Sequence, residues 1–204
     1  MTADINMNPA IETKRTCDKR LTPFMEQLEI IYKKMDEKYD ERAAHYGFFC
    51  GGCKDNCCFT RFYHHTFVEY LYMIEGFATL GHANRAEIRE KALLVCRQTA
   101  ELEKSGLPVR LLCPLNYQGL CALYSYRPMI CRLHGIPHEL IIPGRKKALS
   151  PGCGEFLSRC GEKEYVTFDR TPFYAGMAGL EKEFKSAFGI SERIKLTVAG
   201  MLVS

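Results

Sequence analysis

Two cysteine-rich segments hold the residues of this chain that are best suited to chemistry. The first segment covers residues 50–58 and contains Cys50, Cys53, Cys57 and Cys58. The second begins more than fifty residues downstream and contains Cys113, Cys121 and Cys131. A free cysteine is usually buried singly, like a small apolar residue, whereas thiolates in groups bind zinc, iron or iron–sulfur clusters. The two segments therefore predict a polythiolate metal centre built from distant parts of the chain.

The spacing within the first segment favours a polynuclear centre. Gly51 and Gly52 allow the backbone to wrap around a metal, and backbone N–H groups in such a turn stabilise thiolate charge. The side chains of adjacent Cys57 and Cys58 diverge, so both join one tetrahedral ion only with backbone distortion. We therefore expect an iron–sulfur cluster, with zinc or mononuclear iron as the alternative.

We expect a hairpin turn and a helical turn to bring the thiols of the second segment together. Cys113 and Cys121 flank a predicted turn at 116–119, and Cys131 follows a helical turn opened by Arg127 and Pro128. Cys153 has glycines on both sides and is the eighth predicted ligand, so that the eight thiols would fill two four-thiolate sites. Cys160 is an alternate ligand, and Cys96, in an apolar helical stretch, is expected in the core.

The second segment also carries a family resemblance. It reads Cys-Pro-Leu, then Gly-Leu-Cys-Ala-Leu-Tyr, then Arg-Pro-Met-Ile-Cys-Arg. With the first segment, this pattern resembles the YkgJ-type cysteine-cluster family, described as zinc- or iron-chelating domains, over residues 48–135. The matched positions are Cys113, Cys121, Tyr124, Arg127, Pro128, Cys131 and Arg132. The resemblance implies a bound metal or iron–sulfur centre and kinship with flagellin lysine-N-methylases. The chain departs from the family where three residues, not two, separate Cys53 from Cys57.

Histidines and arginines near the cysteines are candidates for roles around the metal. His64, His65 and His134 are read either as ligands or proton-transfer groups, or as ordinary core and surface histidines. Arg127 and Arg132 would offset the negative charge of a thiolate cluster, or form ordinary ion pairs. The sequence has no dinucleotide fingerprint, P-loop, Gly-x-Ser-x-Gly elbow or radical S-adenosylmethionine spacing.

Composition narrows the class of protein and its compartment. The net charge of +4 is mild and the charges are interspersed, so we expect no nucleic-acid partner. The first twenty residues lack an apolar signal region, and no stretch approaches the roughly 20 apolar residues of a membrane span. We therefore predict a cytoplasmic protein, in which eleven cysteines stay reduced.

The predicted fold is mainly α: a single compact helical domain at 21–204, with one or two small β-hairpins organised around the cysteine-rich metal centre, preceded by a flexible arm at 1–20. Helices are expected at 22–47, 66–81, 84–106 and 171–189, with a terminal helix capped by Ser191. Thr22 is expected as the N-cap of the first, and a Thr66–Glu69 capping box should open the second. Hairpins are expected at 111–124 and 139–149.

Three functions remain open for such a domain. The first is an iron–sulfur or other metal-binding protein of the YkgJ type. The second is a metal-dependent redox or group-transfer enzyme, with protein-lysine methylation as one version, which requires an open coordination position and a pocket beside the histidines. The third is a structural zinc module that mediates protein contacts.

Overall fold

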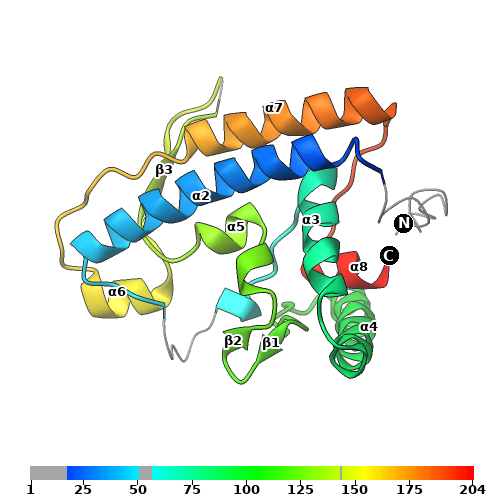
Figure 1. Ribbon diagram of the computed structural model, residues 1–204. Coiled ribbons are helices and arrows are strands. Elements are labelled where there is room, and N and C mark those ends of the chain that lie inside the picture. Colours follow the sequence, from blue (N-terminus) through cyan, green and yellow to red (C-terminus); the bar gives the residue numbers. More distant parts are fainter. Residues whose placement is uncertain (1–17, 51–56, 143) are drawn as a thin grey trace.

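The computed structural model describes residues 18–50, 57–142 and 144–204, and Figure 1 shows their arrangement. The helical elements are α2 (Thr22–His45), η1 (Cys57–Phe59), α3 (Phe67–Ala78), α4 (His82–Lys104), η2 (Tyr124–Tyr126), α5 (Met129–Arg132), α6 (Gly154–Cys160), α7 (Thr171–Phe188) and α8 (Val198–Val203). The strands are β1 (Asn116–Tyr117), β2 (Leu120–Cys121), β3 (His138–Leu140) and β4 (Ala148–Ser150). This confirms the prediction of a mainly helical fold with two small hairpins. Residues 1–17 of the predicted arm lie outside the described residues.

Helices α2 and α7 run side by side in opposite directions and form the upper layer in Figure 1. Pro23 occupies the first turn of α2, where its fixed φ suits a helix start and its missing N–H is not needed. Leu21, and not Thr22 as predicted, is the N-cap residue. Gly189 ends α7 in the left-handed conformation, with φ 63°, as the sequence predicted for this position.

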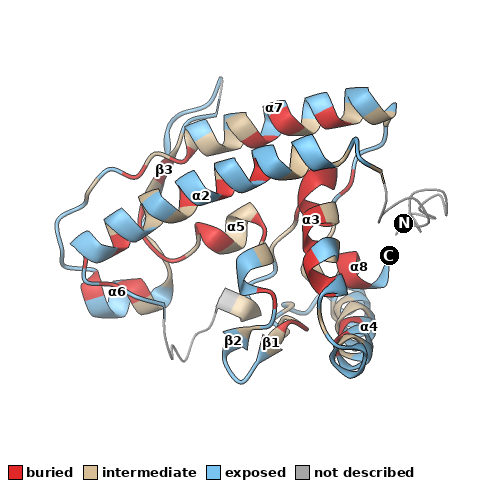
Figure 2. Cartoon of the chain, in the orientation of Figure 1, coloured by how far each residue is buried: buried red, intermediate tan, exposed pale blue. Residues whose placement is uncertain are grey.

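The inner face of α2 supplies much of the core. Leu28, Tyr32 and Met35 recur at helical spacing and are at most 2% exposed. Figure 2 shows this buried stripe facing α3 and α5, with exposed residues on the outer side. Because burying one such side chain contributes about 1.5–3 kcal/mol, the stripe fixes how α2 sits over the elements below it.

Helix α3 begins where predicted but is capped by a distant residue. The Thr66 side chain does not cap a backbone N–H of the helix, so the predicted capping box is absent. Instead, the Glu181 carboxylate on α7 accepts hydrogen bonds from the N–H groups of Phe67 and Val68, at 3.0 and 3.2 Å. A carboxylate at a helix N-terminus satisfies free donors and complements the helix dipole, so α7 also anchors α3.

Glu69 connects three helices from the buried side of α3. It is 4% exposed, and its carboxylate accepts hydrogen bonds from the Tyr32 hydroxyl (3.1 Å), the Thr66 hydroxyl (2.6 Å) and the Met129 backbone N–H (2.7 Å). The last bond satisfies a free donor at the start of α5. Glu69 is therefore a structural junction between α2, α3 and α5, and not the capping residue predicted from the sequence.

Both predicted hairpins exist, but the first is much shorter than expected. In β1–β2, Asn116 pairs with Cys121 and Tyr117 with Leu120, and Cys113 lies before the strand. The turn residues Gln118 and Gly119 both have positive φ, which this tight hairpin turn requires. In β3–β4, residues 138–140 pair with 148–150, so this hairpin extends one residue beyond the predicted range of 139–149 at each end. Pro143, at the predicted turn, lies outside the described residues.

The prediction of a terminal helix capped by Ser191 is wrong in its start. Residues 191–197 are not helical, and Leu196 forms an antiparallel bridge with His64. Helix α8 begins only at Val198, where the Thr197 hydroxyl accepts a hydrogen bond from the Gly200 N–H. The segment at 191–197, which local sequence signals assigned to a helix, contributes Leu196 to this long-range bridge instead.

Helices α4 and α6 lie below α2 and α7 in the view of Figure 1. Helix α4 packs on α8 and buries few of its own residues, Ile88 and Ala92 among them. Helix α6 was not predicted, and Cys153 is its N-cap residue. Of the helices that the structure describes, none is both long enough and apolar enough to cross a membrane.

We predict that Glu69→Ala lowers the free energy of unfolding by about 3 kcal/mol, because it leaves buried donors without an acceptor. Urea denaturation measures the change. Glu75→Ala is the matched control, since Glu75 is exposed on the same helix. Equal stability of the two variants would contradict the junction role.

Candidate metal centre

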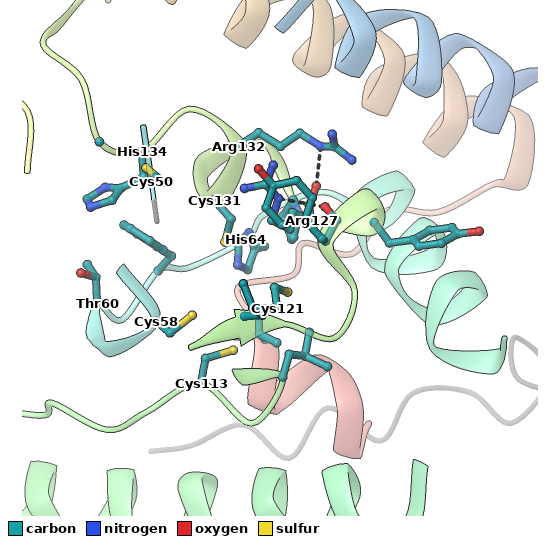
Figure 3. A pocket seen from close by; sticks show the side chains of 18 of the residues that line it. Cys50, Cys58, Thr60, His64, Cys113, Cys121, Arg127, Cys131, Arg132 and His134 are labelled. Carbon is teal, nitrogen blue, oxygen red and sulfur yellow. Dashed lines mark hydrogen bonds between the residues drawn. The ribbon is translucent and has the colours of Figure 1, made fainter. Parts of the chain in front are cut away.

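Four cysteines, here called the inner thiols, surround one space below α5 (Figure 3). They are Cys58, Cys113, Cys121 and Cys131. All four line a cavity of about 820 Å³. They come from two distant parts of the chain, and a backbone hydrogen bond of 2.8 Å from the Cys113 N–H to the Cys58 carbonyl joins these parts.

Each inner thiol is placed by a different local structure. Cys58 lies on the short helical turn η1, and Cys121 lies in β2. Cys113 precedes the β1–β2 hairpin, and the Asn116 N–H donates to its carbonyl at 2.9 Å. Cys131 is on α5, the helix whose first turn Glu69 holds. The junction at Glu69 thus fixes the helix that carries Cys131 relative to α2 and α3.

Backbone amides point at two of the inner thiols. The N–H of Leu115 donates to the Cys113 sulfur, and the N–H of Leu123 donates to the Cys121 sulfur. In both cases the donor is two residues after the cysteine, and the hydrogen bond lowers the pKa of the thiol. Such donors stabilise sulfur when it is negative, which is the form that binds metals.

Burial opposes ionisation of the same thiols. It raises the pKa of Cys113 to about 12 and raises the pKa values of Cys121 and Cys131 above the ordinary thiol value. The inner thiols also raise one another's pKa, because a second negative charge in the same space is unfavourable. Burial therefore favours the protonated form of Cys113, Cys121 and Cys131.

The two arginines predicted near the metal have different surroundings. The Arg127 guanidinium stacks on the Tyr124 ring at 3.5 Å, and its charge lowers the pKa values of Cys121 and Cys131. Arg132 is 5% exposed; it pairs with Asp36 on α2 at 2.5 Å and lies over the Tyr32 ring. Arg127 thus acts on the thiols, whereas Arg132 ties α5 to α2.

Cys50 and Cys153, here called the outer pair, line the same cavity, next to Tyr39. The Tyr39 hydroxyl lies 3.5 Å from the Cys50 sulfur and donates to the His134 carbonyl at 3.0 Å. Burial raises the pKa of Tyr39, and charge on Cys50 or Cys153 raises it further. Gly135 has φ 126°, and a Cβ there would lie 2.6 Å from the Tyr39 hydroxyl, so the backbone must pass close at this position.

Of the three candidate histidines, two line the cavity. His64 is 3% exposed, and burial lowers its pKa, so the imidazole is neutral near pH 7. His134 lies with its ring 5.1 Å from the ring of Phe62. His65 is exposed and does not line this cavity.

The remaining cysteines divide between structural thiols and undescribed positions. Cys160 is buried and donates to the Tyr46 carbonyl at 3.4 Å, and Cys96 packs against the core from α4, as predicted. Cys17, Cys53 and the side chain of Cys57 lie outside the part of the chain that the structure describes.

Sequence reasoning missed Tyr39 as a member of the site. Its position continues the buried stripe of α2 through Tyr32 and Met35, at helical spacing. That periodicity identifies the face of α2 on which Tyr39 lies, but nothing in the sequence says that Cys50 lies opposite.

Among the described residues, no three or more His, Cys, Asp and Glu side chains form a group that could hold a metal ion as they lie. Comparisons with protein-family models, with curated proteins and with solved structures returned no match to this chain. The resemblance to the YkgJ-type family therefore stays a prediction.

The raised pKa values predict how the metal-free protein responds to alkali. A thiol whose pKa is higher in the folded state stabilises the fold below its unfolded value, about 8.5, and this contribution is lost as pH rises toward the folded value. We expect the free energy of unfolding to fall by at least about 2 kcal/mol between pH 8 and 10, each unit of pKa being worth about 1.4 kcal/mol.

Urea denaturation with reductant and chelator measures this slope. Cys131→Ser should flatten it, because one buried thiol is removed, while Cys96→Ser should change it less. Stability that stays constant to pH 10 would contradict the burial of the inner thiols.

Proposed function

We propose that this protein is a metal-binding protein whose inner thiols hold an iron–sulfur cluster, with zinc or mononuclear iron as the alternative. The observation that carries the proposal is the grouping of Cys58, Cys113, Cys121 and Cys131 around one cavity. The side chains must turn toward one another to bind metal, since as they lie no described group could hold one. Rotation of a cysteine side chain between staggered positions is a small rearrangement.

Core packing alone does not account for this arrangement. Isolated core thiols need no backbone donors, yet Leu115 and Leu123 donate to Cys113 and Cys121. The nearby Arg127 charge likewise favours thiolate. These features stabilise negative sulfur in a place where burial opposes it, and a bound cation resolves that conflict because metal binding displaces the thiol protons.

Three considerations favour a cluster over a single zinc ion. Adjacent Cys57 and Cys58 fit a polynuclear centre better than one tetrahedral ion, and Cys50 and Cys153 supply further thiols along the same cavity. A closed four-thiolate zinc site also needs no chamber of about 820 Å³ beside it. Thiols in this number are kept reduced in the cytoplasm, which is the compartment we propose.

The cavity supports a second candidate function, a metal-dependent redox or group-transfer enzyme. Such an enzyme needs a space for substrate next to the metal, and His64 and His134 line the same cavity as the inner thiols. Protein-lysine methylation is the version that the family resemblance suggests, and its substrate would be another protein. A structural zinc module for protein contacts remains the third reading, and it gives the cavity no role.

We predict that protein purified without oxygen is coloured and contains iron and acid-labile sulfide. Visible absorption and elemental analysis test this directly. A colourless sample with zinc as its only metal would exclude the cluster and leave the zinc alternative. A sample free of both metals after anaerobic loading would contradict the proposed function altogether.

We predict that Cys121→Ser and Cys131→Ser each weaken metal binding by more than about tenfold. Even residues that only hydrogen-bond to a metal ligand typically contribute that much to metal affinity. Titration of the metal-free protein measures the affinity. Cys96→Ser is the matched control, because Cys96 is half-buried on α4 and does not line the cavity. If all three variants bind metal equally well, the inner thiols are not the ligands.

A further inference from the structure

The backbone of His64 is held rigidly beside the inner thiols. Its N–H donates to the Leu196 carbonyl at 2.8 Å, and its carbonyl accepts from the Leu196 N–H at 3.0 Å. Along the chain, His64 lies between η1, which carries Cys58, and helix α3. The bridge therefore fixes the direction in which the imidazole leaves the backbone.

The Nε2 atom of His64 is buried and has no hydrogen-bond partner among the described residues. A buried polar atom without a partner typically costs about 1–3 kcal/mol, so such atoms in native proteins usually have a ligand, an ion or a water. His64 is also among the least exposed polar residues, at 3%. Its unpartnered nitrogen therefore indicates a binding partner that the described residues do not supply.

The surroundings of the ring identify the kind of partner. Figure 3 shows the imidazole of His64 beside Cys131 and directed toward the space that Cys58 and Cys121 also face. All of these residues line the same cavity. A neutral imidazole offers one nitrogen lone pair, and metals that bind thiolates also bind imidazole nitrogen.

We infer that His64 Nε2 is a nitrogen ligand of the metal centre held by the inner thiols. The inference rests on the proposed function and deepens it, because it makes the centre a mixed cysteine–histidine site. Four thiols and one imidazole are more donors than one tetrahedral ion takes, so a centre that uses all five holds more than one metal atom. Replacing thiolate by neutral imidazole also raises the reduction potential of an iron–sulfur centre.

Cobalt(II) is the probe for this ligand, because it occupies zinc- and iron-type thiolate sites and is paramagnetic. The full-length, metal-free protein is loaded with Co²⁺ without oxygen, and pulsed electron paramagnetic resonance detects nitrogen bound directly to the metal. We expect strong imidazole ¹⁴N coupling in the unmodified protein, and its loss in His64→Gln, whose amide keeps a polar group in the pocket but is a poor ligand.

His65→Ala and His134→Gln are the matched controls, and both should retain the coupling. His65 is the exposed neighbour of His64, and His134 is the other histidine on the cavity wall. If His64→Gln does not fold, retention of the coupling in His134→Gln leaves His64 as the ligand of the two histidines that line the cavity.

The outcomes separate the inference from the proposed function. If cobalt binds but the spectrum shows no directly bound nitrogen, or if the coupling survives His64→Gln, His64 is not a ligand and the thiolate centre stands. Weak coupling, typical of an N–H donor to sulfur, would overturn the inference in the same way. If cobalt does not bind and anaerobic loading with iron and sulfide also leaves the protein free of metal, the proposed function fails, and the inference fails with it. If only iron and sulfide are taken up, the same ¹⁴N coupling is sought on the reduced iron centre, and its survival in His64→Gln overturns the inference alone.

Discussion

The buried carboxylate of Glu69 is the interaction on which the arrangement of this domain depends. It accepts from Tyr32 on α2, from Thr66 before α3 and from the first N–H of α5, so a single side chain fixes the relative positions of three helices. A buried carboxylate is tolerated only when its oxygens are satisfied, and this requirement selects one packing of the three elements. Because α5 carries Cys131, the geometry of the inner thiols depends on the same group.

The sequence predicted those elements whose boundaries are set locally. Pro23 and Gly189 mark the ends of α2 and α7 because their conformational limits act on the backbone itself. The errors arose where a distant residue decides the local structure. Glu181 caps α3 from α7, and Leu196 pairs with His64, so neither the capping box at Thr66 nor the helix start at Ser191 forms.

Cysteine spacing predicted part of the candidate site, but neither Tyr39 nor the division into inner and outer thiols. Cysteine spacing indicated that Cys58 would meet Cys113, Cys121 and Cys131, and the structure brings these four to one cavity. The outer position of Cys50 and Cys153 depends on the close approach of the backbone at Gly135 to Tyr39, which spacing cannot reveal. The same is true of the unpartnered nitrogen of His64, since it results from three-dimensional burial.

The separation of Cys58 from the other inner thiols along the chain gives the proposed metal a topological effect. Between Cys58 and Cys113 lie helices α3 and α4, a stretch of more than fifty residues. A metal bound to both ends holds this stretch closed in the folded protein, and because the ion is released on unfolding, its binding free energy adds to the stability of the whole stretch. Loss of the metal would then destabilise both α3 and α4, and not only the residues that bind the ion.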